Sequence, residues 1–180
     1  MTAPQQQTGG AATTGATRLG YLHTTVPEQV YASRPDGELA VCDLRITVTN
    51  HTPGPVYCPQ LTIRLPVGAG AAQFARFGAG ITAQAIPATW TVTAVQDDVL
   101  IAVPDSGAAR FEPSPFGSAR APTPSLVVEL RGIRVNRDPG TTVVHVDELA
   151  GTAPAGPWSA ASHTISIVKR APHSAPGDES

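Results

Sequence analysis

The chain has 180 residues and a formal net charge of -2, so it is long enough for one hydrophobic core and lacks the basic stripe that holds a nucleic-acid backbone. No run of about eighteen apolar residues occurs, so no membrane-spanning helix is expected. Lys169 is the only lysine, and arginine, alanine, glycine and proline are abundant, which is typical of a high-GC bacterial genome such as that of an actinobacterium.

The two ends of the chain are polar and rich in glycine, proline, serine and threonine. Residues 1–19 and 171–180 are predicted to form disordered tails, because they carry too little apolar surface to bury. The amino end has no basic start and no long apolar run, so it does not predict an export signal. We therefore expect a single domain over residues 20–170, in a protein that is cytoplasmic or released without a cleavable signal peptide.

Between the tails the hydrophobic pattern has a period of two residues, which predicts strands. Cys42, Leu44, Ile46 and Val48 alternate with polar residues, so 39–49 reads as a half-buried strand. Further strands are predicted at 21–31, 60–65, 89–95, 98–103, 125–135, 141–149 and 163–169. Seven to nine strands joined by turn-forming segments at 51–55, 96–98 and 136–140 predict an all-β fold, an antiparallel β-sandwich.

Two details of this pattern stand out. Only residues 71–77 could form a short helix. Gly132 interrupts the alternation of its strand, because Leu130 and Ile133 fall on opposite phases, and a β-bulge there would return both side chains to the core.

The segment ITVTNHTPGPVYCPQLTIRLP, residues 46–66, contains a strand that ends in TVTN, a polar turn, the pair PV and a strand that ends in LP. It resembles a recurring signature of bacterial immunoglobulin-like domains. The resemblance implies an immunoglobulin-like β-sandwich used for adhesion, spacing or assembly, and it carries no catalytic residues across. The chain is longer than such modules usually are.

Three side chains in or near this segment are of chemical interest. Asn50 is predicted to be a turn residue whose amide binds nearby backbone. Cys42 falls on the inward phase of its strand and Cys58 on the outward phase, so we expect two reduced thiols unless a bulge at Pro59 redirects Cys58.

The segment HVDE, residues 145–148, is the best candidate for a metal site in the sequence. His145 and Asp147 would project from one face of a strand, and a neighbouring strand could add a third ligand. The alternative is a strand end with solvated polar side chains. An acidic pair at 97–98 could bind calcium, or it could form only a turn.

Two connections, 67–88 and 105–124, are longer than closing a hairpin requires, and such loops are often functional. The second connection carries aromatic and arginine side chains of the type that anchors protein interfaces. These predicted binding residues are Arg110, Phe111, Phe116 and Arg120.

The two tryptophans suggest different roles. Trp90 alternates with Val92 and is expected in the core. Trp158, in AGPWSA, is the better surface candidate, and it could stack on sugar rings, with Tyr21, Tyr31 and Tyr57 extending the platform.

The sequence contains no nucleophile elbow, phosphate-binding glycine loop or zinc-helix motif. We therefore predict a non-catalytic protein without a cofactor, which binds protein partners or assembles with itself. A carbohydrate-binding or calcium-dependent surface module is the alternative, and an enzyme whose residues assemble only in the folded chain is a third. An unpaired edge strand could recruit a partner's strand, but the sequence does not tell which edge.

Overall fold

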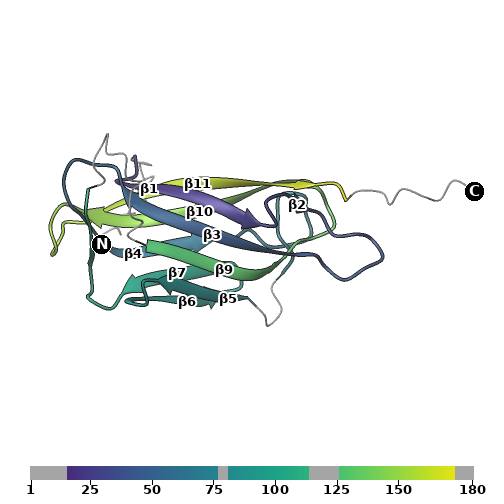
Figure 1. Ribbon diagram of the computed structural model, residues 1–180, viewed down its shortest axis with the longest axis horizontal. Coiled ribbons are helices and arrows are strands. Elements are labelled where there is room, and N and C mark those ends of the chain that lie inside the picture. The colour runs from purple at the N-terminus through teal and green to yellow at the C-terminus, as the bar shows by residue number, and fades with distance from the viewer. Residues whose placement is uncertain (1–15, 77–80, 114–125, 173–180) are drawn as a thin grey trace, which may run out of the picture.

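The computed structural model describes residues 16–76, 81–113 and 126–172, and these residues form eleven strands in two packed sheets (Figure 1). The strands are β1 (Leu19–Val26), β2 (Val30–Tyr31), β3 (Val41–Asn50), β4 (Val56–Arg64), β5 (Thr82–Ile86), β6 (Trp90–Gln96), β7 (Val99–Pro104), β8 (Ala109–Phe111), β9 (Leu126–Arg134), β10 (Gly140–Gly151) and β11 (Ser159–Arg170). None of the described ranges contains a helix long and apolar enough to cross a membrane.

The four-stranded sheet has the order β1-β3-β9-β5, and the seven-stranded sheet has the order β2-β11-β10-β4-β7-β6, with β8 paired to the start of β4. All pairs are antiparallel except β2 with β11. The predicted all-β, antiparallel sandwich is thus confirmed. The sequence predicted seven to nine strands and the described residues form eleven. The prediction missed strands because β2, β5 and β8 are too short to show an alternating pattern.

The core is one cluster formed by the inward side chains of both sheets. Trp90 is buried, as predicted, and its ring meets Phe111 edge-on with centroids 6.1 Å apart. Phe111 is only 1% exposed, so the prediction that it anchors a partner at the surface is wrong. Pairing of β8 with β4 turns this side chain inward, a long-range contact that the loop sequence does not reveal.

The segment predicted as a possible helix is a closed loop in its described part, residues 71–76. The Phe74 N–H donates to the Pro66 carbonyl at 2.8 Å, and the Phe74 carbonyl accepts from the Gly68 N–H at 2.7 Å. The Phe74 side chain is fully buried, so core burial decides the conformation. The connection 67–88 also contains β5, and is not a free loop.

Gly132 lies in the predicted β-bulge. Between the pairs Cys42–Ile133 and Leu44–Leu130, β9 carries one residue more than β3. Gly132 has a φ of +82°, a conformation that side chains disfavour, and its N–H donates to Asp43 Oδ1 at 2.9 Å.

A second bulge decides the position of Cys58. β4 carries an extra residue between Tyr57 and Gln60, so Cys58 turns inward and is fully buried. The outward position predicted for Cys58 is therefore wrong. Both thiols are nevertheless free, as expected; Cys42 lies in the four-stranded sheet and Cys58 in the seven-stranded sheet.

The two long sides of the sandwich differ. On one side the chain passes directly from β5 to β6, and on the other side, bordered by β1 and β11, it passes from β1 to the two-residue strand β2 (Figure 1). There the rings of Tyr21 and His163 stack with centroids 5.1 Å apart. β1 begins at Leu19, so the predicted amino-terminal tail ends slightly earlier than expected, and most of both predicted tails lies outside the described residues.

Candidate interaction surface

The outer face of the seven-stranded sheet is built from rows of side chains that cross several strands. The central row places Asp147 and Thr62 beside Ile101. Its outer members, Ser162 on β11 and Thr93 on β6, extend it to both sides. In this row, hydroxyl and β-branched side chains therefore surround the carboxylate of Asp147.

His145 and Asp147 project from this face together, as the sequence predicted. Asp147 Oδ2 accepts a hydrogen bond from Arg64 Nε at 2.8 Å, and Oδ1 accepts from the Ser162 hydroxyl. Among the described residues, no group of three or more His, Cys, Asp or Glu side chains could hold a metal ion. The described part of the chain thus gives this pair an ion-pair partner and no third ligand.

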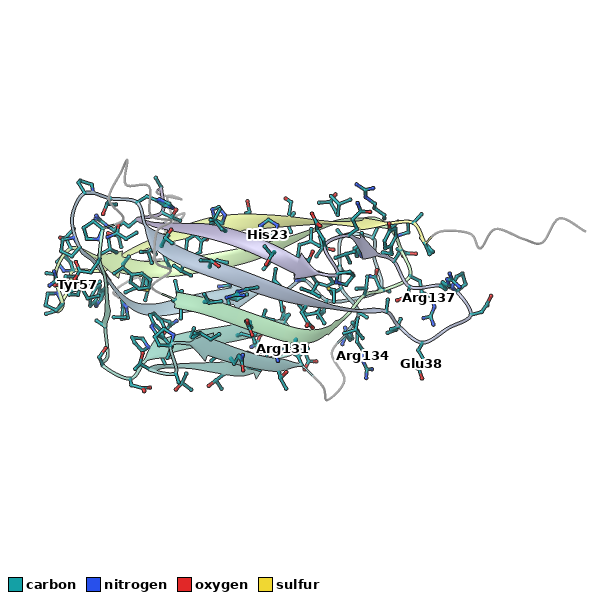
Figure 2. All side chains as sticks on the ribbon, in the orientation of Figure 1. His23, Glu38, Tyr57, Arg131, Arg134 and Arg137 are labelled. Atoms are coloured by element: carbon teal, nitrogen blue, oxygen red, sulfur yellow. The ribbon has the colours of Figure 1, made fainter. Side chains whose placement is uncertain are left out.

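Arg110 of β8 lies over Tyr57 of β4 at one end of this face. The two residues are cross-strand partners, and the Arg110 guanidinium carbon is 5.9 Å from the Tyr57 ring centroid. Arg110 Nε is 2.6 Å from Glu112 Oε1, and this carboxylate raises the pKa of the guanidinium. Figure 2 shows Tyr57 at one end of the sandwich and Glu38 and Arg137 toward the other.

The Trp158 side chain lies against Gly151 of β10, which is the cross-strand partner of Tyr57. Gly151 pairs with Tyr57, and because Ala150 before it is inward, the missing Gly151 side chain would point outward. A Cβ at Gly151 would lie only 3.1 Å from Trp158 Cε3 and 2.5 Å from the Pro157 carbonyl oxygen. The indole can therefore lie on the strand only because residue 151 is glycine. We call Tyr57, Arg110 and Trp158 the anchor group.

The buried side chain of Asn50 joins the turn after β3 to β8, the strand that carries Arg110. Its Oδ1 accepts from the Thr52 N–H at 2.9 Å and its Nδ2 donates to the Gly54 carbonyl at 2.8 Å, which confirms the predicted turn role. Nδ2 also donates to the Phe111 carbonyl at 2.9 Å. This second contact, absent from the prediction, fixes β8 and hence the position of Arg110.

The outer face of the four-stranded sheet carries a charged cluster around Glu129. Glu129 Oε2 accepts hydrogen bonds of 2.8 Å from Gln84 and from Arg131, while Arg45 lies 3.9 Å from Oε1. The bonds from Gln84 and Arg131 lower the pKa of the Glu129 carboxyl.

The folded chain brings together two of the five predicted binding residues, Arg110 and Trp158. Phe111 belongs to the core, whereas Phe116 and Arg120 lie outside the described residues. Tyr57 was considered only as part of a sugar platform. Its place in the anchor group follows from pairing with β8 and β10, for which the sequence holds no local signal.

If the protein were an enzyme, the best candidate catalytic residues would lie between β1 and β11. His23, Glu28 and Ser166 line a cavity of about 170 Å³ there. Among the described residues no hydrogen bond joins His23 to Glu28 or to Ser166, and the Glu28 carbonyl accepts one from the Thr25 hydroxyl at 3.1 Å. Figure 2 shows His23 at this side of the sandwich.

Neither cysteine has the setting of a catalytic thiol. Burial raises the pKa of Cys42 to about 12, and burial also raises the pKa of Cys58 to about 12 despite a hydrogen bond to the Gln60 carbonyl. Reactive thiols need a lowered pKa and access to solvent.

Both thiols are therefore expected to react with a thiol-specific chromogenic reagent only when the chain unfolds. The stability that they contribute is complete below the ordinary thiol pKa of 9.0 and is lost as the pH rises toward about 12, because the unfolded chain releases the thiol protons first. Denaturant unfolding across this range measures the loss, and a variant with both Cys42→Ala and Cys58→Ala provides the control. Rapid modification of the native protein would contradict the burial of these residues.

Comparison with known proteins finds only distant structural similarities. No protein-family model matches the chain, and no curated protein matches its sequence. Among solved structures, the bacterial hydrophobin BslA is 13% identical with a TM-score of 0.44, covering 89% of this chain and 98% of its own. A structure concerned with fibronectin binding and biofilm formation by AAF fimbriae of enteroaggregative Escherichia coli is 10% identical with a TM-score of 0.29, covering 83% and 99%.

A third structure, of AvmM, which catalyses macrocyclization in alchivemycin A biosynthesis, is 12% identical with a TM-score of 0.33, covering 94% of this chain and 100% of its own. These low scores assign the chain to none of the three families. The resemblance to immunoglobulin-like domains therefore stays a prediction.

Proposed function

We propose that the protein is a non-catalytic bacterial β-sandwich that binds another protein through the outer face of its seven-stranded sheet. The observation that carries this proposal is the anchor group. Tyr57, Arg110 and Trp158 come from three separate segments and converge at one end of an exposed sheet face.

The chemistry of the anchor group suits a protein partner. Tyrosine, tryptophan and arginine are the residues most enriched among those that dominate binding energy at interfaces. Arg110 is already held by Glu112 and by the ring of Tyr57, and Trp158 is held against Gly151, so little side-chain freedom would be lost on binding. The surrounding threonines and valines can exclude water from such a centre.

Affinity capture from the source bacterium, followed by titration of the purified partner, tests this proposal. Trp158→Ala and Arg110→Ala are each expected to weaken binding by roughly tenfold to a hundredfold. Thr93→Ala, on the same face but on β6, is the matched control and should bind as the wild type does. Unchanged affinity in both anchor variants, or a native chain that captures no partner, would refute the proposal.

The two outward aromatic side chains favour carbohydrate binding as the second candidate. The Trp158 indole lies against Gly151, the cross-strand partner of Tyr57, and planar rings on an exposed face can stack on sugar rings. A glycan array distinguishes the two functions. A signal that Trp158→Ala abolishes would support carbohydrate binding, whereas an array without signal would remove it.

A further inference from the structure

β11 is the longest open edge formed by the described residues. β11 pairs with β10 from Ser159 to Lys169 without a register shift, whereas β2 covers its other side only at Lys169 and Arg170. The Arg170 carbonyl accepts from the Ala32 N–H on that side at 2.8 Å. Because the backbone groups of a strand alternate in direction, every second residue before Arg170 turns its N–H and C=O toward the open edge. These residues are Ala160, Ser162, Thr164, Ser166 and Val168.

This edge lacks the features that usually prevent strand pairing. From Ser159 to Val168 it contains no charged residue, no proline and no bulge. Two other edges carry protective features: β6 has a bulge near Gln96, and β5 is five residues long with Pro87 directly after it. The β1 edge is shorter than that of β11, eight residues, and Pro27 follows it directly. Natural proteins protect exposed edges in these ways, so an unprotected one indicates a pairing surface.

Apolar side chains border the same side of the sandwich. Leu22 and Val26 on β1 are 63% and 65% exposed, and Val168 on β11 is 57% exposed. On this side the chain passes from β1 to β2, which pairs with β11 at Lys169 and Arg170, and no other described strand pairs with this edge of β11 (Figure 1). Of these three, Val168 would lie beside a partner strand that extends the seven-stranded sheet, whereas Leu22 and Val26 point out from the four-stranded sheet.

We propose that β11 pairs antiparallel with β11 of a second copy of this chain. A two-fold axis through Thr164 would place Ser162 opposite Ser166 and Ala160 opposite Val168, with their edge-facing N–H and C=O groups matched. No like charges would meet, because the strand carries none in this range. The inference goes beyond the proposed function, since the pairing uses the backbone of β11 from Ala160 to Val168 and none of the side chains of the anchor group.

Sedimentation velocity over a wide range of protein concentration tests the pairing. The native chain is expected to dimerise, and Thr164→Lys is expected to weaken dimerisation by roughly tenfold or more, because the axis brings two lysines together. Thr93→Lys adds the same charge at an exposed position of β6, the opposite edge, and should leave dimerisation unchanged.

Ser166→Pro provides a second variant. It removes an N–H that faces the open edge and leaves the hydrogen bonds with β10 intact, so the fold should persist while dimerisation weakens. Amide hydrogen exchange at Ser162, Thr164 and Ser166 should slow with rising concentration of the native protein.

A chain that is monomeric at every concentration, or a dimer that both variants leave intact, would overturn the inference. Binding of an extended peptide to the edge of a monomer would also overturn it, in favour of a different partner. None of these outcomes alters the partner titration with the Trp158 and Arg110 variants, so the two proposals fail independently.

Discussion

Replacing Glu148 with alanine is expected to lower the free energy of unfolding by about 4 kcal/mol, because three donors from the start of β1 would lose their acceptor inside the sandwich. Glu148 is 2% exposed. Its carboxylate accepts from the Arg18 N–H at 2.6 Å and the Leu19 N–H at 3.3 Å, and from the Tyr21 hydroxyl at 2.6 Å. This side chain of β10 therefore ties β1 of the opposite sheet to the seven-stranded sheet.

Tyr21 reports on the same contact. Burial, and next the charge of Glu148, raise the pKa of the Tyr21 phenol far above its ordinary value. Loss of the carboxylate should therefore loosen β1, and the amide protons of β1 should exchange faster than those of β10.

Chemical denaturation measures the effect, and Asp147→Ala is the matched control. Asp147 is the adjacent residue on the outer face, where it pairs with Arg64, so its loss should cost less than about 1 kcal/mol. Tyr21→Phe removes one of the three donors and should cost about 1 kcal/mol. Equal stability of Glu148→Ala and Asp147→Ala would show that the buried carboxylate does not hold β1.

The second large effect is expected at Lys169, where alanine should lower the free energy of unfolding by about 3 kcal/mol. Lys169 is 1% exposed, and its Nζ donates to the Gln73 carbonyl and, at 2.7 Å, to Asn136 Oδ1. Asn136 Nδ2 in turn donates to the Gly70 carbonyl at 2.7 Å. The single lysine of the chain thus holds the loop that inserts Phe74 into the core.

The contribution of Lys169 to stability is expected to increase with pH in the alkaline range. Burial lowers the pKa of the Lys169 ammonium, with Asp138 acting in the opposite direction. Between the lowered pKa and the ordinary value of 10.5, the folded chain binds fewer protons than the unfolded chain, so the contribution of Lys169 to stability rises with pH.

Denaturant unfolding of the native protein and of Lys169→Ala as a function of pH measures both effects. Arg170→Ala changes the next side chain, which is exposed, and should alter stability by less than about 0.5 kcal/mol. A difference between the native protein and Lys169→Ala that falls with pH over that alkaline range would contradict the lowered pKa of the buried amine.

The sequence by itself determined the fold class and the long strands. The alternation through Leu44, Ile46 and Val48 reflects burial of one face, which is a local property of a strand, so it can be read without knowledge of the neighbours. The bulge at Gly132 and the turn role of Asn50 were predictable for the same reason, since each depends on residues close in the chain.

Only the tertiary structure decided the positions that depend on pairing between distant segments. A bulge against β10 turns Cys58 inward, and pairing with β4 buries Phe111. Charged residues such as Glu148 and Lys169 look like surface residues in the sequence, because their partners lie 127 to 130 and 33 to 96 positions away. The anchor group and the open edge of β11 arise in the same way, since strand order, and not local composition, places side chains side by side or leaves an edge without a neighbour.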